Sequence, residues 1–283
     1  MAILRGGRNV TLTIEKSELT PIVDHYGGSR TFERTLSHIA DKADFLRLFA
    51  RYVHFNSIFG SGVANLAGAI AARQDLFRDL QEPATLTADR SVEVASYFFA
   101  TAVDEFAGKS DRRQYTHRFL AQASLKAAAQ FFGYGGSALD RSAPLNKATH
   151  MAVREVMQGY GLQQPMEEEN LFSAMGFHLG SEILADAEFR ILDNCLHSKW
   201  RELAEFMERS PRFAGGDYGA DSWVHLHARI EADHFELART GSNRAFLYYA
   251  GTHCQADLRT WILNGFSKFT EVQARFMENL MED

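Results

Sequence analysis

The feature that most constrains the fold is a stripe of residues between positions 223 and 237, spaced alternately by four and three. The stripe consists of Trp223, His227, Ile230, His234 and Leu237. This spacing is typical of the buried face of a helix in a bundle, because side chains separated in this way lie on one side of the helix. The segment therefore predicts a bundle helix whose two histidines point into the core.

The same helix carries three residues that can bind a metal. His227, Glu231 and His234 follow one another at offsets of four and three residues, which places them within an arc of roughly 60°. Two imidazoles and a carboxylate suit Fe, Mn or Zn. A metal would also satisfy polar groups that are costly to bury alone. The alternative is that these histidines are only hydrogen-bonded in the core.

The scarcity of proline and of turn signals predicts an all-α fold. The 283 residues include only five prolines, and a chain of this length can bury a substantial core. We expect one domain over residues 1–283 with about eight helices, in which residues 1–28 form an arm and residues 9–16 alternate like an extended segment. The expected helices are 30–57, 60–80, 88–108, 113–133, 145–160, 166–208, 217–240 and 243–281.

Composition argues against several classes of function. The formal net charge is −6 and basic residues form no cluster, so no nucleic-acid partner is expected. The apolar stretch 61–72 is too short to span a bilayer, and the N-terminus lacks a secretory signal. The two cysteines, Cys195 and Cys254, form no disulfide or zinc pattern. We therefore expect a cytoplasmic protein with no membrane partner.

Other predicted helices also carry ionisable residues on apolar faces. Glu182 lies on a largely apolar face one turn after His178, Glu105 ends a stripe that begins at Val94, and His117 begins another. Facing helices of a bundle supply metal ligands in this way. The alternative is that both glutamates form salt bridges. Without a metal, Glu182 is expected to be buried and unpaired, which would raise its pKa.

Three motifs occur in order between residues 88 and 240. They are Glu105 followed by a glycine turn and His117-x2-Leu120, then Gly176-Phe-His-Leu-Gly-Ser-Glu182, then His227-x3-Glu231-x2-His234. Together they resemble the haem-oxygenase-like di-metal oxidases, the group called iron-containing redox enzymes, which includes the CADD-like proteins. The resemblance implies a haem-oxygenase-like helical bundle.

Carried over position by position, the resemblance also implies a ligand set and a reaction. The six implied metal ligands are Glu105, His117, Glu182, His227, Glu231 and His234. The implied cofactor is two iron ions, with manganese as an alternative, and the three glutamates would have the catalytic role of bridging the metals and balancing their charge. The implied activity is that of a non-haem di-iron or Mn/Fe oxidase or oxygenase, which uses O₂ to oxidise a small organic substrate.

The sequence departs from the family pattern at two points. Many members place the first Glu and His close together on one helix, whereas Glu105 and His117 are twelve positions apart. Twelve helical residues span about 18 Å, so the chain must turn near Gly108 if both residues are ligands. In addition, Glu231 stands where many members have Asp.

Metal-free proteins of the same fold remain alternatives. A thiaminase-like enzyme needs a positioned cysteine nucleophile, and neither cysteine has such a context. A haem oxygenase would need a proximal histidine near the N-terminus, for which His25 or His38 could serve. A cofactorless oxidase-like enzyme and a ligand-binding or scaffold protein are also open. So is a homodimer formed through the arm at residues 9–16.

Overall fold

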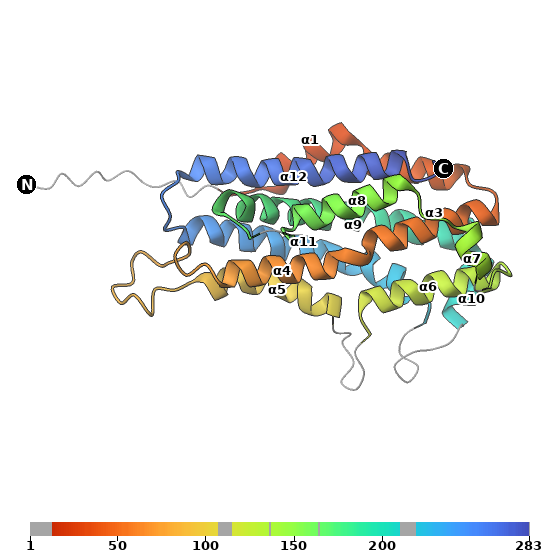
Figure 1. Cartoon of the computed structure of the whole chain (residues 1–283), viewed down its shortest axis with the longest axis horizontal. Coiled ribbons are helices and arrows are strands. Elements are labelled where there is room, and N and C mark those ends of the chain that lie inside the picture. The colour runs from red at the N-terminus through yellow and green to blue at the C-terminus, as the bar shows by residue number, and fades with distance from the viewer. Residues whose placement is uncertain (1–12, 107–114, 136, 164, 210–218, 283) are drawn as a thin grey trace, which may run out of the picture.

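A computed structural model describes residues 13–106, 115–135, 137–163, 165–209 and 219–282 (Figure 1). These residues are almost entirely helical, which confirms the all-α prediction. Their extended pairing is limited to two isolated bridges, Phe77 with Tyr249 and Arg78 with Asp89. None of the described helices is both long enough and apolar enough to cross a membrane.

The chain forms more helices than the eight expected. In order, they are α1 (Lys16–Tyr26), α2 (Gly28–His38), α3 (Lys42–Phe55), a 3-10 turn (Asn56–Ile58), α4 (Phe59–Ala71), α5 (Ser91–Phe106), α6 (His117–Phe131), α7 (Ser137–Ser142), α8 (Lys147–Gly159), α9 (Glu168–Ser198), α10 (Arg201–Arg209), α11 (Ser222–Tyr248) and α12 (Gln255–Glu278).

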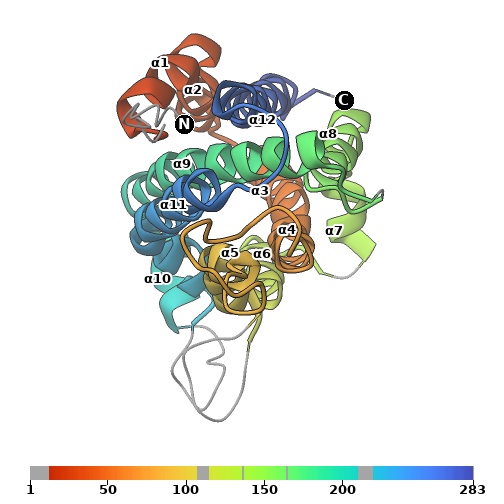
Figure 2. The ribbon, with the colours of Figure 1, turned by 90° about the vertical axis from the view of Figure 1, so that its left-hand side faces the viewer.

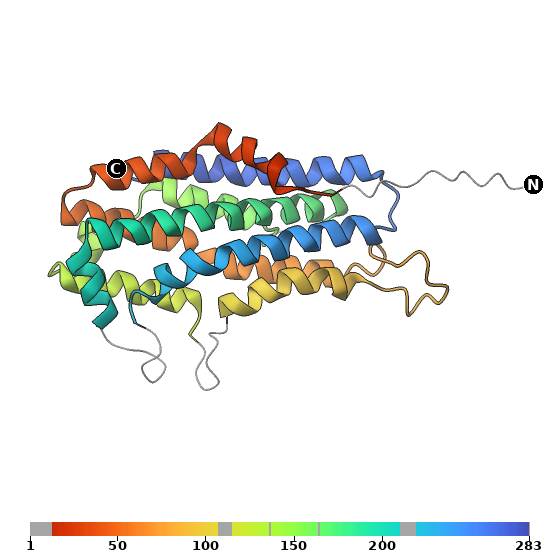
Figure 3. The ribbon, with the colours of Figure 1, turned by 180° about the vertical axis from the view of Figure 1, so that it is seen from behind.

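The long helix α9 is the centre of the bundle. It packs against α12 and α2 on one side and against α11 and α4 on the other, while α5 packs against both α4 and α11. Figure 2 shows this arrangement end-on, and Figure 3 shows α9 and α11 running side by side between α12 and α5. The faces of α5, α9 and α11 that meet inside the bundle are therefore shielded from water.

Two glycines bring α9 and α12 into direct backbone contact. A Cβ at Gly176 would lie 1.8 Å from the carbonyl oxygen of Ile262, and a Cβ at Gly265 would lie 1.8 Å from that of Ser173. Neither backbone could accommodate a side chain at these points. The close approach fixes the position of α9 and of the face that carries Glu182.

The N-terminal region differs from the expected arm. Residues 9–12 lie outside the described part of the chain, but helix α1 already begins at Lys16 and α2 follows it. The backbone N–H of Ile14, a buried residue, donates a hydrogen bond to Asn243 Oδ1 at 2.7 Å. The residue Ile14 therefore contacts the protein's own helix α11, while α1 packs on α12.

Several predicted helix boundaries were also wrong. The helix predicted over 60–80 ends at Ala71 as α4, and the helix predicted over 243–281 begins only at Gln255 as α12. The helix predicted over 30–57 is divided into α2 and α3, since the Asp41 side chain accepts a hydrogen bond from Ala43 N–H and caps a new helix start. The helix predicted over 166–208 is divided between α9 and α10. The helix predicted to end at residue 240 continues to Tyr248. Gly241 lies inside α11, where a Cβ would clash with Phe98, so this glycine permits close packing and does not end the helix.

Candidate metal centre

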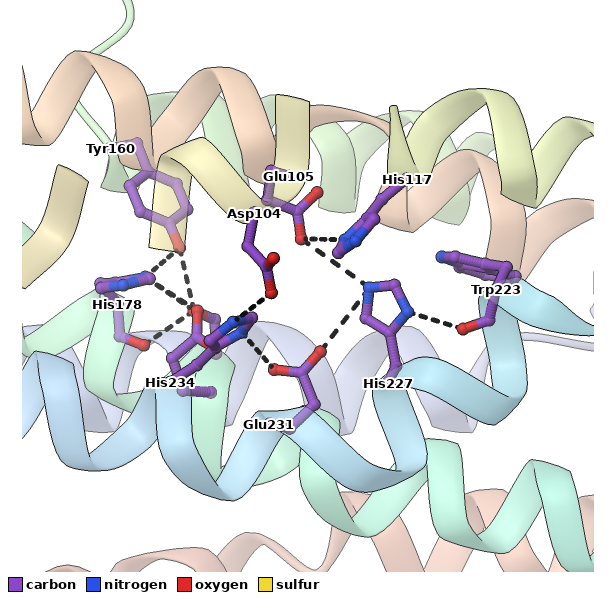
Figure 4. A network of polar contacts seen from close by, with 11 residues as sticks. Asp104, Glu105, His117, Tyr160, His178, Trp223, His227, Glu231 and His234 are labelled. Atoms are coloured by element: carbon purple, nitrogen blue, oxygen red, sulfur yellow. Dashed lines mark hydrogen bonds and ion pairs between the residues drawn. The ribbon is translucent and has the colours of Figure 1, made fainter. Parts of the chain in front are cut away.

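All six predicted ligands come together where α5, α6, α9 and α11 meet (Figure 4). They form two sets of three, and in each set the ligand atoms lie within 4.8 Å of one another. We call them the first set (Glu105, His117 and His227) and the second set (Glu182, Glu231 and His234). Five of the six side chains are buried and Glu105 is half-buried.

The spacing between Glu105 and His117 does not keep them apart. Glu105 lies one residue before the end of α5, and His117 is the first residue of α6. The two helices bring His117 Nδ1 to 3.0 Å from Glu105 Oε1. The described ends of the two helices thus bring both side chains to one site. Gly108, where a turn was expected if both residues are ligands, lies outside the described residues.

Glu231 connects the two sets. Its Oε1 lies 3.7 Å from His227 Nε2 in the first set, and its Oε2 lies 3.5 Å from His234 Nδ1 in the second. Because one carboxylate directs an oxygen to each set, it has the arrangement of a bridging ligand.

Two acceptors orient the histidines of α11. His227 Nδ1 lies 2.6 Å from the carbonyl oxygen of Trp223. A carbonyl can only accept, so this nitrogen carries the hydrogen and Nε2 is left as a lone-pair donor facing the site. Similarly, His234 Nε2 lies 3.0 Å from Asp104 Oδ2, and its Nδ1 faces Glu182 Oε2 at 3.6 Å. Imidazoles that bind metals are commonly held in this way.

The sequence analysis did not identify Asp104 as part of the site. Asp104 precedes Glu105, so a helical turn of about 100° places it off the apolar stripe that identified its neighbour. It could have been found by a different signal. A buried histidine that binds a metal needs a hydrogen-bond acceptor for its second ring nitrogen, and a nearby carboxylate commonly serves.

A group of polar side chains that includes His178 and Tyr160 (Figure 4) contacts Glu182. His178 Nδ1 lies 3.1 Å from Glu182 Oε1. The hydroxyl of Tyr160 lies 3.0 Å from His178 Nδ1 and 2.9 Å from Ser181 Oγ. All of these side chains are buried, so Glu182 is held by a buried polar network.

The predicted direction of the Glu182 pKa was wrong. Burial alone would raise this pKa, but His178 and then His234 favour the carboxylate, and the pKa is lowered. The pKa of Glu231 is raised instead, because this residue is buried and faces the charge of Glu182. The prediction failed because Glu182 is paired with imidazoles even without a metal.

The histidines of the site also differ in their affinity for protons. Burial lowers the pKa of His227, and the nearby His117 lowers it further. Burial would likewise lower the pKa of His234, but hydrogen bonds to Asp104 and Glu182 outweigh burial and raise it. In the absence of metal, therefore, His234 carries a proton that a metal would displace.

The two sets line a cavity of about 170 Å³. Glu105, His117, Glu182, His227 and Glu231 all contribute to its surface. The rest of the wall combines polar residues, among them Asn56, Thr116, Arg118 and Glu188, with an aromatic part. The aromatic part consists of Phe55, Phe59, Phe106, Phe189, Trp223 and Phe269. A small molecule in this cavity would lie beside the ligand atoms.

The residues considered for the alternative functions lie elsewhere. His25 and His38 are exposed on α1 and α2. Cys254 is exposed and Cys195 is half-buried, and neither lines the cavity. None of these four side chains is therefore placed to act on a molecule bound there.

No protein-family model matches the chain, and no curated protein matches it. The donor set and its geometry are therefore the grounds for inferring a function.

Proposed function

We propose that the chain is a non-haem di-metal oxidase or oxygenase. It would bind two iron ions, or a manganese–iron pair, and use O₂ to oxidise a small organic substrate. The observation that carries the proposal is the pair of ligand sets joined through Glu231 in the wall of the cavity. The resemblance of the motifs to haem-oxygenase-like di-metal oxidases supports it, and the same resemblance leads us to propose that fold for the bundle.

The donor set suits iron or manganese. It consists of three carboxylates and three imidazoles, which are hard oxygen and borderline nitrogen ligands, and it contains no thiolate. Ligand atoms about 2.1 Å from one ion lie at most about 4.2 Å apart. Sets whose atoms lie within 4.8 Å of one another need only a small inward movement to bind an ion each.

Each residue has a defined role in this proposal. The first set would bind one ion and the second set the other, while Glu231 would contact both. Two redox-active divalent ions, when bound, supply electrons for the reduction of O₂. Asp104 and the carbonyl of Trp223 fix which imidazole nitrogen faces the site. His178 and Ser181 hold the carboxylate of Glu182 in place.

The cavity would bind the substrate. Its aromatic wall offers apolar contact to an organic molecule. Because the ligand residues form part of the same wall, a bound molecule would be held beside the metals. Such confinement favours one orientation of the substrate over others.

Oxygen consumption by the iron-loaded protein tests the proposal. Purified protein is loaded with Fe(II) without air and mixed with O₂ in an oxygen electrode, and the wild type should consume O₂. Glu182→Gln removes one ligand charge at nearly constant shape, so it should abolish uptake while the helical circular-dichroism spectrum is retained. The control is Glu236→Gln, which changes an exposed residue of α11 and should leave uptake unchanged.

Two results would contradict the proposal. One is the absence of O₂ uptake by wild-type protein that has bound iron. The other is uptake at the wild-type rate by Glu182→Gln.

A further inference from the structure

A fourth glutamate lines the cavity but belongs to neither ligand set. Glu188 lies on α9 and is 4% exposed. The three glutamates of the ligand sets each lie near at least one imidazole. Glu188 instead accepts hydrogen bonds from two uncharged groups, the hydroxyl of Tyr52 at 3.0 Å and Nε2 of Gln273 at 2.6 Å.

Glu188 has no cationic group among its described contacts, although the exposed Arg118 lines another part of the same cavity. Within the described residues, neither its hydrogen bonds nor the causes of its pKa shift include a cationic group. Burial accordingly raises the pKa of Glu188 to about 7. A buried carboxylate without an opposite charge is costly. A cation bound in the cavity would remove this cost.

The dimensions of the cavity limit the size of such a cation. Its volume is about 170 Å³, and an apolar cavity of about 150 Å³ in an engineered protein holds one benzene molecule. The aromatic wall suits an apolar body and also favours a nearby ammonium group. The cavity therefore has room for about one ring with a short side chain.

The position of Glu188 would direct a bound molecule towards the ligand sets. Glu188 follows Glu182 by six residues on α9, which corresponds to about 9 Å along the helix axis. Both residues line the same cavity. A molecule held by a charged group at Glu188 would therefore extend its other end towards Glu182.

We propose that Glu188 binds an ammonium group, so that the cavity accepts a small primary amine whose apolar body lies against the aromatic wall. The inference that such amines are substrates of an oxidase rests on the proposed function. The inference that the cavity binds them requires no metal.

Calorimetric titration with a matched pair of probes tests the inference. Benzylamine carries the ammonium group, and benzyl alcohol is its uncharged analogue. Each is titrated into the full chain, both without metal and after anaerobic Fe(II) loading. The wild type should bind benzylamine at least tenfold more tightly than benzyl alcohol. Glu188→Gln should still bind the alcohol and should lose this preference. Glu169→Gln, which changes an exposed residue of the same helix, should retain it.

Two outcomes would overturn the inference. One is equal affinity of the wild type for both probes, a comparison that does not depend on any variant folding. The other is an unchanged preference in Glu188→Gln, because the amine would then bind at another carboxylate or at a metal.

Iron content measured on the same samples separates this inference from the proposed function. A preference for the amine in protein that binds no iron contradicts only the proposed function. Two bound ions without the preference contradict only the role of Glu188.

Discussion

His234 depends on a neighbour that is not itself a ligand. Asp104 accepts a hydrogen bond from His234 Nε2 at 3.0 Å, which directs Nδ1 towards the second set. Groups that orient a ligand imidazole in this way also increase its basicity. Asp104 comes from α5, whereas His234 lies on α11, so the contact also connects two walls of the site.

Replacing Asp104 should weaken metal binding without removing a ligand. Asp104→Asn no longer provides a charged acceptor, and loss of such a partner typically lowers metal affinity by about 10–100-fold. Competition with a chelator of known affinity measures the change. Asp233→Asn is the control, since Asp233 is exposed beside His234 on α11. Equal affinities in the two variants would show that Asp104 does not act through His234.

Glu188 should make stability depend on pH. Burial raises its pKa from an ordinary value near 4.5 to about 7, so the folded protein holds this proton more tightly than the unfolded chain does. The resulting stabilisation is fully present below about pH 4.5 and is lost as the pH rises to about 7. It amounts to about 3 kcal/mol, since a tenfold change in proton affinity corresponds to about 1.4 kcal/mol.

Urea denaturation at pH 5 and pH 8 measures this effect. The free energy of unfolding of the wild type should fall between the two pH values by about 2.5 kcal/mol more than that of Glu188→Gln, because a small part of the effect is already lost at pH 5. The comparison isolates Glu188, because all other titrating groups are shared. An identical pH dependence in the two proteins would mean that Glu188 is already ionised in the folded state at pH 5.

At the scale of helices, the contact between α9 and α12 determines where Glu182 lies. Gly265 and Gly176 allow the two backbones to touch. Gly265→Ala should therefore force the helices apart and destabilise the fold by about 3 kcal/mol, as overpacking of a tight contact does. Thermal unfolding followed by circular dichroism measures the change.

The matched control for this helix contact is Gly68→Ala in α4. Gly68 is exposed, and a Cβ there would have no neighbour within 4 Å. Alanine is the better helix former by about 1 kcal/mol, so this variant should be slightly more stable than the wild type. If Gly265→Ala were as stable as Gly68→Ala, the two helices would not be in the close contact described.

The sequence predicted the residues of the site better than the boundaries of its helices. His227, Glu231 and His234 could be identified because one helix carries all three, and helical spacing alone places them on one face. The division between α2 and α3 was missed, because a cap at Asp41 interrupts a pattern that looks continuous. The pairing of Glu182 with His234 was missed for another reason, since His234 reaches it from a different helix. His178, one turn before Glu182, was visible in the sequence, but its effect on the pKa of Glu182 was not anticipated.

At the scale of the whole molecule, the centre joins parts of the chain that lie far apart in sequence. Its ligands extend from Glu105 on α5 to His234 on α11. Without metal, the site holds a carboxyl group with a raised pKa at Glu231 and a protonated imidazole at His234. Ions that replace these protons would connect all four helices.

Metal should therefore stabilise the folded protein. A ligand that binds only the folded state adds about 2.7 kcal/mol when its concentration is about 100 times its dissociation constant. Mn(II), which does not require exclusion of air, should raise the melting temperature measured by calorimetry. His227→Ala should show a smaller increase. An unchanged melting temperature of the wild type at saturating Mn(II) would argue against a metal site built from these helices.

The most direct test of the paired-metal centre is the number of iron ions bound per chain under anaerobic conditions. Wild-type protein titrated with Fe(II) should bind two ions. His227→Ala should bind at most one, because the first set would keep only Glu105 and His117 with the shared Glu231. His225→Ala, a change to a neighbouring histidine that belongs to neither set, should still bind two. Fewer than two ions in the wild type, or two in His227→Ala, would contradict the account.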